Sequence, residues 1–126
     1  MAERESKEIE AASKRVADAR IWLHIDEKAR RLEELNEQIA SPDFWNDASR
    51  AQEVSRQASA LRNAVESYGE AVATLEDARA AAELAGEDPA FAEEKDVALQ
   101  RLSAMLERFE IDSWFSGEMD ESDAIL

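Results

Sequence analysis

This sequence offers few residues for acid–base or nucleophilic catalysis. The first candidate is its single histidine. His24 adjoins Trp22 and Leu23, and the sequence contains no cysteine. Acid–base catalysis needs a base that meets a nucleophile and an orienting group, and no serine lies in a strained-turn motif such as Gly-x-Ser-x-Gly. The sequence therefore predicts no catalytic residue and no enzymatic activity of its own.

Closely spaced carboxylates are the other chemical feature, and they favour solvated helix faces over a metal site. Di-metal helical bundles use Glu-x-x-His motifs on two helices, which one histidine cannot supply. The stretch "DSWFSGEMDESD" (112–123) has a glycine as calcium loops do, but Trp114 stands where an oxygen ligand is needed. We expect no metal and no cofactor. The carboxylate pairs are Glu33 with Glu37, Glu93 with Glu94, and Glu107 with Glu110.

The charge balance indicates which partners the chain favours. The 126 residues carry 30 acids and 15 bases, a net charge of −15, and residues 110–126 hold six acids and no base. Such a chain repels phosphate backbones, so we expect no direct nonspecific binding to nucleic acid and favour a basic partner. The absence of cysteine, of a signal-like apolar core and of a membrane-length apolar run favours the cytoplasm and predicts no membrane contact.

The apolar residues recur at helical spacing through four segments, which predicts an all-α protein. The third segment is expected to be a helix over 47–84, which at 1.5 Å per residue is more than about 50 Å long. Its apolar residues follow a heptad pattern. We expect an elongated antiparallel bundle or hairpin of three to four long helices, coiled-coil-like, with a short non-helical C-terminal tail. The heptad positions are Val54, Ala58, Leu61, Val65, Tyr68, Val72 and Leu75.

The expected helix boundaries rest on capping chemistry. Gly86 is placed to end the third helix in a left-handed conformation, and Asp88 before Pro89 reads as an N-cap for the fourth. Gly117 ends the helical pattern. Around "RIWLHID" two interpretations stay open, a break between the first two segments or one bent helix.

The stretch "SPDFWND" (41–47) places Phe44 and Trp45 together at a corner between two helices. We expect both aromatic side chains to fold back and cover the end of the apolar seam, since large aromatics are usually packing residues. The alternative is an exposed aromatic that binds a partner. Asn46 or Asp47 is expected to cap the long helix that follows.

These motifs together resemble a known family. "RIWLHIDEKARRLEELNEQIASPDFWNDASRAQ", followed by a long helix, "LAGEDPAF", another helix and "FSGEMDESDAIL", is similar to the N-terminal helical domain of the bacterial peptide chain release factor 2 family, class I release factors. The resemblance covers roughly residues 15–126 in collinear order. Its most specific residues are Pro42, Asp43, Phe44, Trp45, Asn46 and Asp47, and Ser116, Gly117 and Glu118.

The resemblance implies a role in translation termination. Such factors recognise UGA or UAA stop codons and promote hydrolysis of peptidyl-tRNA, while their helical N-terminal domain is non-catalytic and reaches toward the stalk base and GTPase-associated centre of the large ribosomal subunit. The family's Gly-Gly-Gln and Ser-Pro-Phe motifs are absent from this sequence. We therefore expect a helical release-factor domain over 1–115, an acidic tail over 116–126 leading into a missing next domain, and a chain that is part of a longer factor or a truncated product.

Two other interpretations rest on general features. The heptad pattern fits a stand-alone acidic coiled-coil scaffold or adaptor, and the net charge fits an inhibitor that mimics nucleic acid. The release-factor interpretation predicts a monomer or weakly self-associating chain that binds ribosomal subunits. A salt-resistant dimer would favour the scaffold.

Overall fold

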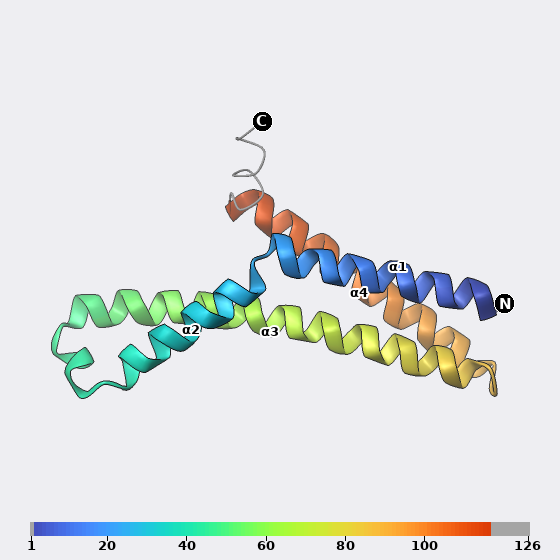
Figure 1. The fold of residues 1–126 in the computed structure, drawn as a ribbon, viewed down its shortest axis with the longest axis horizontal. Helices are drawn as coiled ribbons and strands as arrows, with labels where there is room; N and C mark the ends of the chain where they lie inside the picture. Colours follow the sequence, from blue (N-terminus) through green and yellow to red (C-terminus); the bar gives the residue numbers. More distant parts are fainter. Residues whose placement is uncertain (1, 117–126) are drawn as a thin grey trace. The chain divides into compact units, whose positions relative to one another are not determined.

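The protein is all-α in the part that the structure describes. A computed structural model describes residues 2–116, with side chains for 7–114. Four α-helices and one 3₁₀ helix follow one another, and no strand occurs in these residues (Figure 1). The expected third helix over 47–84 is confirmed to within a residue at each end. The elements are α1 (Ala2–Trp22), α2 (Ile25–Ala40), η1 (Pro42–Asn46), α3 (Ala48–Ala85) and α4 (Ala90–Ser116).

The chain forms two compact units, and α3 contributes to both. One unit is His24–Tyr68, which holds α2, η1 and the first part of α3. We call it the hairpin unit. The other is Met1–Leu23 with Gly69–Leu126, which holds α1, the rest of α3 and α4. We call it the three-helix unit, and each unit is described by itself below.

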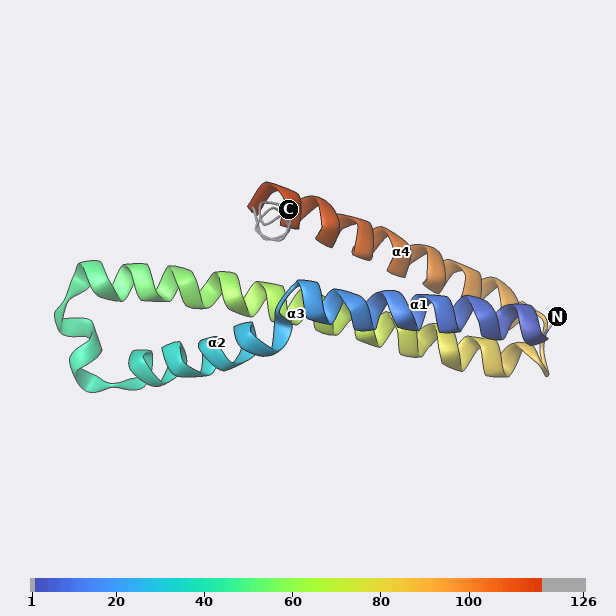
Figure 2. The same cartoon turned by 45° about the horizontal axis from the view of Figure 1, so that its top comes forward.

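In the hairpin unit, α2 and the first part of α3 run antiparallel and are joined by η1 (Figure 2). Polar contacts also join the two helices, since Arg50 Nη2 donates to Gln38 Oε1 at 3.4 Å and Arg62 Nη2 to Asn36 Oδ1 at 3.5 Å. Burial of the apolar seam supplies most of the stabilisation, because exposed polar pairs add little. The seam consists of Leu35, Phe44, Ala51, Val54 and Ala58, with Leu32, Ile39 and Leu61 packed against it.

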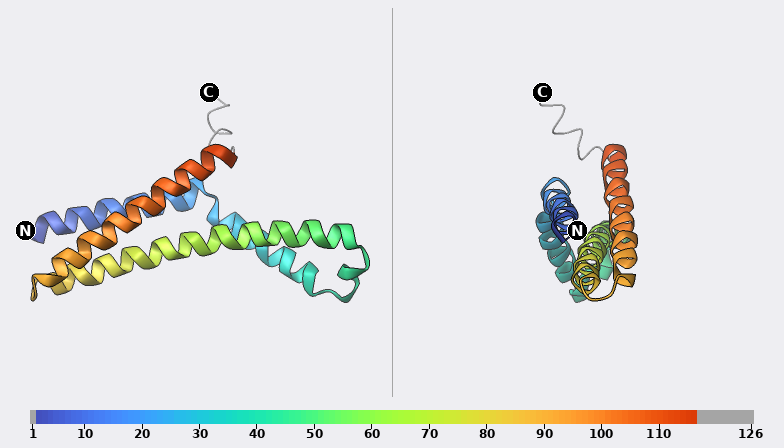
Figure 3. Two further views of the ribbon diagram at one scale, coloured as in Figure 1. Left: turned by 180° about the vertical axis from the view of Figure 1, so that it is seen from behind. Right: turned by 90° about the vertical axis from the view of Figure 1, so that its right-hand side faces the viewer.

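In the three-helix unit, α1 and α4 run in the same direction and α3 runs antiparallel to both (Figure 3). Arg15 Nη1 on α1 donates to Ser103 Oγ on α4 at 3.1 Å, and Arg79 Nη2 on α3 donates to Ser13 Oγ on α1 at 2.9 Å. Many buried positions are alanine, whose small side chain lets helices approach closely. The buried apolar residues are Ile9, Val16, Ala19, Leu23, Ala71, Leu75, Ala78, Ala81, Leu102 and Leu106.

The heptad pattern predicted for α3 holds at most of its positions and fails at Val72. Val54, Ala58 and Tyr68 are buried as predicted, but Val72 is exposed. Leu75 is buried as predicted, while Ala71, Thr74, Ala78 and Ala81 are buried although the pattern did not include them. The physical reason is that α3 faces one helix in the hairpin unit and two in the three-helix unit, so a wider and rotated face is covered there. Thr74 tolerates burial because its hydroxyl donates to the Glu70 carbonyl at 2.8 Å.

The predicted cap of α4 is confirmed and the predicted cap of α3 is wrong. The Asp88 carboxylate accepts a hydrogen bond from the Ala90 N–H at 3.0 Å, as an N-cap does. Gly86 does not adopt the left-handed conformation. Instead, α3 ends through tightened turns, in which the N–H groups of Gly86 and Glu87 donate to carbonyls three residues back.

The break between α1 and α2 is real, which settles the open question at "RIWLHID". His24 has φ 55° and ψ 44°, a left-handed conformation, and it is the only non-glycine residue with positive φ in the described part of the chain. Histidine adopts this region more readily than most residues, although it still costs free energy. One strained residue therefore turns the chain from α1 into α2.

We expect substitutions of His24 to change stability according to their tolerance of positive φ. His24→Val should lower the free energy of unfolding by about 1–2 kcal/mol because a β-branched side chain clashes in this conformation. His24→Gly should leave it unchanged or raise it by up to about 1 kcal/mol. Urea denaturation followed by circular dichroism measures both. Equal stability of the two variants would contradict the left-handed turn.

Candidate functional site

The one histidine of the chain lies on the surface at the α1–α2 turn. Its Nδ1 is 4.0 Å from Glu27 Oε2, and both side chains are mostly exposed. All six residues of the acid pairs singled out in the sequence are exposed. Within the described residues no group of three or more histidine and carboxylate side chains could hold a metal ion.

The two aromatic residues at the tip of the hairpin unit differ in burial. Phe44 is buried in the apolar seam, as predicted. Trp45 is 61% exposed and stands edge-on to the Phe44 ring, with the ring centroids 4.9 Å apart. The prediction that Trp45 covers the seam is therefore wrong. A 3₁₀ helix of five residues presents one side chain inward and its neighbour outward, and Phe44 already fills the inward position.

The other residues of the 41–47 motif build this tip. Pro42 begins η1, and the Asp47 carboxylate accepts a hydrogen bond from the Arg50 N–H at 3.1 Å, so Asp47, not Asn46, caps α3. Asp43 and Asn46 are exposed. A small hollow of about 200 Å³ beside the tip is lined by Gln38, Ser41, Asp43, Phe44, Asp47 and Arg50. The tip thus exposes an indole, and Asp43 and Asp47 lie two residues before and after it in the sequence.

The second motif of the resemblance lies at the end of the described chain. Ser116 is the last residue of α4, so the helix reaches one residue past the predicted domain boundary at 115. Gly117 and Glu118 lie outside the described residues, as does the predicted non-helical tail. Their predicted role stays a prediction.

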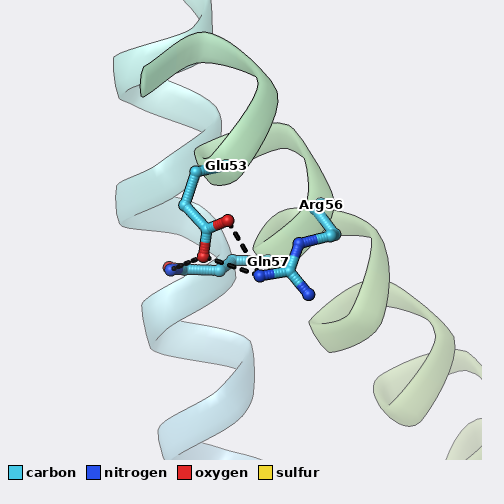
Figure 4. A network of polar contacts seen from close by, with 3 residues as sticks. All are labelled: Glu53, Arg56 and Gln57. Atoms are coloured by element: carbon cyan, nitrogen blue, oxygen red, sulfur yellow. Dashed lines mark hydrogen bonds and ion pairs between the residues drawn. The ribbon is translucent and has the colours of Figure 1, made fainter. Parts of the chain in front are cut away.

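On the outer face of α3, Glu53, Arg56 and Gln57 form a local polar network (Figure 4). Arg56 Nη2 donates to both Glu53 oxygens at 2.8 Å, and Gln57 Nε2 donates to Oε1 at 3.1 Å. The Arg56 hydrogen bond, with help from Gln57, holds the pKa of Glu53 below its ordinary value, and Glu53 raises the pKa of Arg56. These groups are exposed and close in sequence, which is typical of a solvated helix face.

Lys95 is a buried charge that the sequence analysis missed. Its side chain is 6% exposed, and its ammonium donates to Glu8 Oε2 on α1 at 2.9 Å and lies 3.3 Å from Asp96 Oδ1. Burial opposes protonation, but the hydrogen bonds with Glu8 and Asp96 outweigh it and raise the pKa of Lys95. The signal was its position four residues after Phe91, on the apolar face of α4.

Several large apolar side chains remain exposed on the described surface. Leu84 and Val97 lie on α3 and α4 of the three-helix unit, Ile21 on α1, and Ile111 and Trp114 toward the end of α4. Large aromatic and aliphatic side chains at the surface mark interaction sites when they cluster. No helix in residues 2–116 has the combined length and apolarity that crossing a membrane requires.

The fold and these surfaces define a class of protein: a helical, acidic chain whose notable surface features are exposed apolar side chains. The sequence profile described as "PCRF domain" matches residues 28–126. The chain belongs to the PCRF-domain family. This confirms the resemblance inferred from the "SPDFWND" and "FSGEMDESDAIL" stretches.

Curated relatives are similar over most of this chain. A peptide chain release factor 2 of Xanthomonas euvesicatoria is 38% identical over 116 residues, covering 89% of this chain and 30% of the relative. Those of Frankia casuarinae and an Exiguobacterium species are 36% and 32% identical over 121 residues each, covering 96% and 94% of this chain and 32% and 33% of the relatives. The chain thus spans about a third of the length of the relatives it matches.

The hairpin tip predicts unequal losses of stability for its two aromatic residues. Phe44→Ala should lower the free energy of unfolding by about 3–5 kcal/mol because it leaves a cavity in the seam. Trp45→Ala should cost about 1 kcal/mol or less, since it removes only the edge contact with Phe44. Thermal unfolding of both variants checks this. A larger loss for Trp45→Ala than for Phe44→Ala would mean that the indole packs in the core.

The Glu8–Lys95 pair predicts an asymmetric response to truncation. Glu8→Ala should cost about 1–3 kcal/mol because it leaves a buried ammonium with one fewer partner. Lys95→Met should cost less, since Glu8 and Asp96 stay hydrated and Met fills the space. Chemical denaturation of the two variants and the double variant measures the difference. Equal losses would contradict a buried Lys95.

The same pair fixes the sign of a pH dependence. The folded-state pKa of Lys95 is raised, so its contribution is fully present below the ordinary lysine pKa, about 10.4, and is lost as pH rises through the folded-state value. The free energy of unfolding should therefore fall more steeply above about pH 10 in the natural chain than in Lys95→Met. Parallel alkaline profiles of the two proteins would contradict this linkage.

Proposed function

We propose that this chain is a non-catalytic ribosome-docking domain of a translation termination factor that recognises UGA or UAA stop codons and promotes peptidyl-tRNA hydrolysis. Membership of the PCRF-domain family and similarity to proteins named peptide chain release factor 2 support this proposal. The sequence lacks Gly-Gly-Gln and Ser-Pro-Phe motifs. Codon reading and hydrolysis therefore belong to other parts of such a factor, and this domain works in the cytoplasm by binding.

The observation that carries the docking proposal is the outward position of Trp45. An indole that is 61% exposed adds little to the fold, whereas tryptophan at the centre of an interface is a frequent hot spot. Trp45 belongs to the motif on which the family resemblance is strongest. We infer that the hairpin tip is a contact surface, and that its target lies at the stalk base of the large ribosomal subunit.

Charge favours a protein target over ribosomal RNA. Asp43 and Asp47 flank Trp45, and the whole chain carries a net charge of −15. Carboxylates next to the anchor repel phosphate and attract Lys or Arg. The partner of the tip is therefore a basic ribosomal protein, and binding should weaken as salt screens the attraction.

The test is co-sedimentation of the chain with purified large ribosomal subunits. Trp45→Ala should weaken binding at least tenfold, about 1.4 kcal/mol, while its melting temperature changes little. Trp114→Ala is the matched control, because Trp114 is 58% exposed but lies on α4 in the other unit. It should bind as the natural chain does.

Three outcomes would overturn parts of this proposal. Failure of the natural chain to sediment with subunits would overturn ribosome docking. Equal binding by the natural chain and Trp45→Ala would overturn the role of the tip. A salt-resistant dimer without affinity for subunits would instead support the acidic scaffold.

A further inference from the structure

A groove lies between α3 and α4 within the three-helix unit. It has a volume of about 670 Å³ and runs along residues 90–101 of α4. At 1.5 Å per residue this stretch is about 18 Å long, or roughly three helical turns. Its lining comprises Thr74, Asp77, Ala80, Ala81, Leu84, Ala90, Phe91, Glu93, Glu94, Val97, Ala98 and Arg101.

The walls of the groove expose apolar side chains that the unit does not use. Val97 is 59% exposed on α4, Leu84 is exposed on α3, and Phe91 is only half-buried between them. Four alanines, Ala80, Ala81, Ala90 and Ala98, are also part of the lining. The opposite side of α4 is already engaged, because Lys95 bonds to Glu8 on α1. The ion pair thus holds α4 against α1, while the side of α4 that faces the groove keeps apolar side chains exposed.

The rim of the groove is acidic. Asp77, Glu93 and Glu94 line it, and within residues 7–114 none of these carboxylates forms an ion pair with another side chain. The segment 80–94 around the α3–α4 connection contains five acids and no base. Arg101 is the single basic side chain of the lining and stands at the far end on α4.

The apolar lining and the acidic rim together indicate which kind of partner would bind in the groove. An apolar trough of about three turns between two helices suits the apolar face of another helix, read by side chains at i, i+3, i+4 and i+7. The acidic rim attracts flanking Lys and Arg. A second copy of this chain carries a net charge of −15 and would be repelled.

We propose that the α3–α4 groove docks a basic amphipathic helix of a partner protein, with the basic side chains over Asp77, Glu93 and Glu94. The apolar anchors of that helix rest on Leu84, Phe91 and Val97. This site is in the three-helix unit and is independent of the hairpin tip. It holds whether or not the tip binds the ribosome.

The test uses a synthetic helical peptide of about 14 residues, with leucines at i, i+3, i+4 and i+7 and lysines elsewhere, labelled with fluorescein. Fluorescence anisotropy with the whole chain should show saturable binding in the micromolar range that weakens with salt. A scrambled peptide of the same composition, without an apolar face, should bind at least tenfold more weakly.

Variants of the chain separate apolar docking from charge attraction. Val97→Glu should weaken binding at least tenfold, although the new carboxylate would strengthen a purely electrostatic attraction. Ile111→Glu is the matched control, because Ile111 is 52% exposed on the same helix but outside the groove. It should bind as the natural chain does. Both sites are exposed and Glu is a good helix former, so circular dichroism should show unchanged helicity.

A third variant tests the rim, since Glu93→Lys with Glu94→Lys should also weaken binding. Equal affinity for the scrambled peptide, or equal loss in Val97→Glu and Ile111→Glu, would overturn the groove as the site. Sedimentation of the natural chain as a dimer that Val97→Glu dissociates would also overturn it, because a second copy would then be the occupant.

Discussion

Helix α3 is the constraint on which both compact units depend. It runs from Ala48 to Ala85 without a glycine kink or a proline, and it supplies one wall of the hairpin unit and one of the three-helix unit. Gly69, its one internal glycine, has open space where a side chain would be. Because one continuous backbone serves both cores, the face that α3 buries must change along its length. That change is visible where Val72 is exposed and Ala71 is fully buried.

Both candidate contact surfaces consist of large apolar side chains that the cores of the two units do not bury. Aromatic residues make up only 6% of the chain, so the position of each one matters for the packing. Phe44 closes the hairpin seam, and the five-residue η1 turn leaves Trp45 outside. In the three-helix unit, alanines let α3 approach its neighbours, while α4 is held against α1 by Lys95 and Glu8. The apolar groove face of α4 is what remains uncovered.

Acidic residues at both surfaces favour basic partners. Asp43 and Asp47 lie two residues before and after Trp45 in the sequence, and Asp77, Glu93 and Glu94 line the groove. Neither surface offers the basic stripe with interleaved aromatics that phosphate backbones need. Both proposed contact surfaces therefore favour basic protein partners.

The sequence by itself determined the helical class, the extent of α3, the Asp88 cap and the family, because these follow from local spacing, capping chemistry and collinear motifs. It also indicated burial of Phe44. Only the tertiary structure decided the fate of Trp45, the register shift at Val72, the ending of α3 without a left-handed Gly86, and the burial of Lys95. The physical reasons are contacts between helices and the geometry of turns. The exposure of Val72 and the burial of Lys95 depend on which helices face one another, which periodicity along one chain does not reveal. The outward position of Trp45 depends on the η1 turn, and the end of α3 depends on the hydrogen bonds of the turn that follows it.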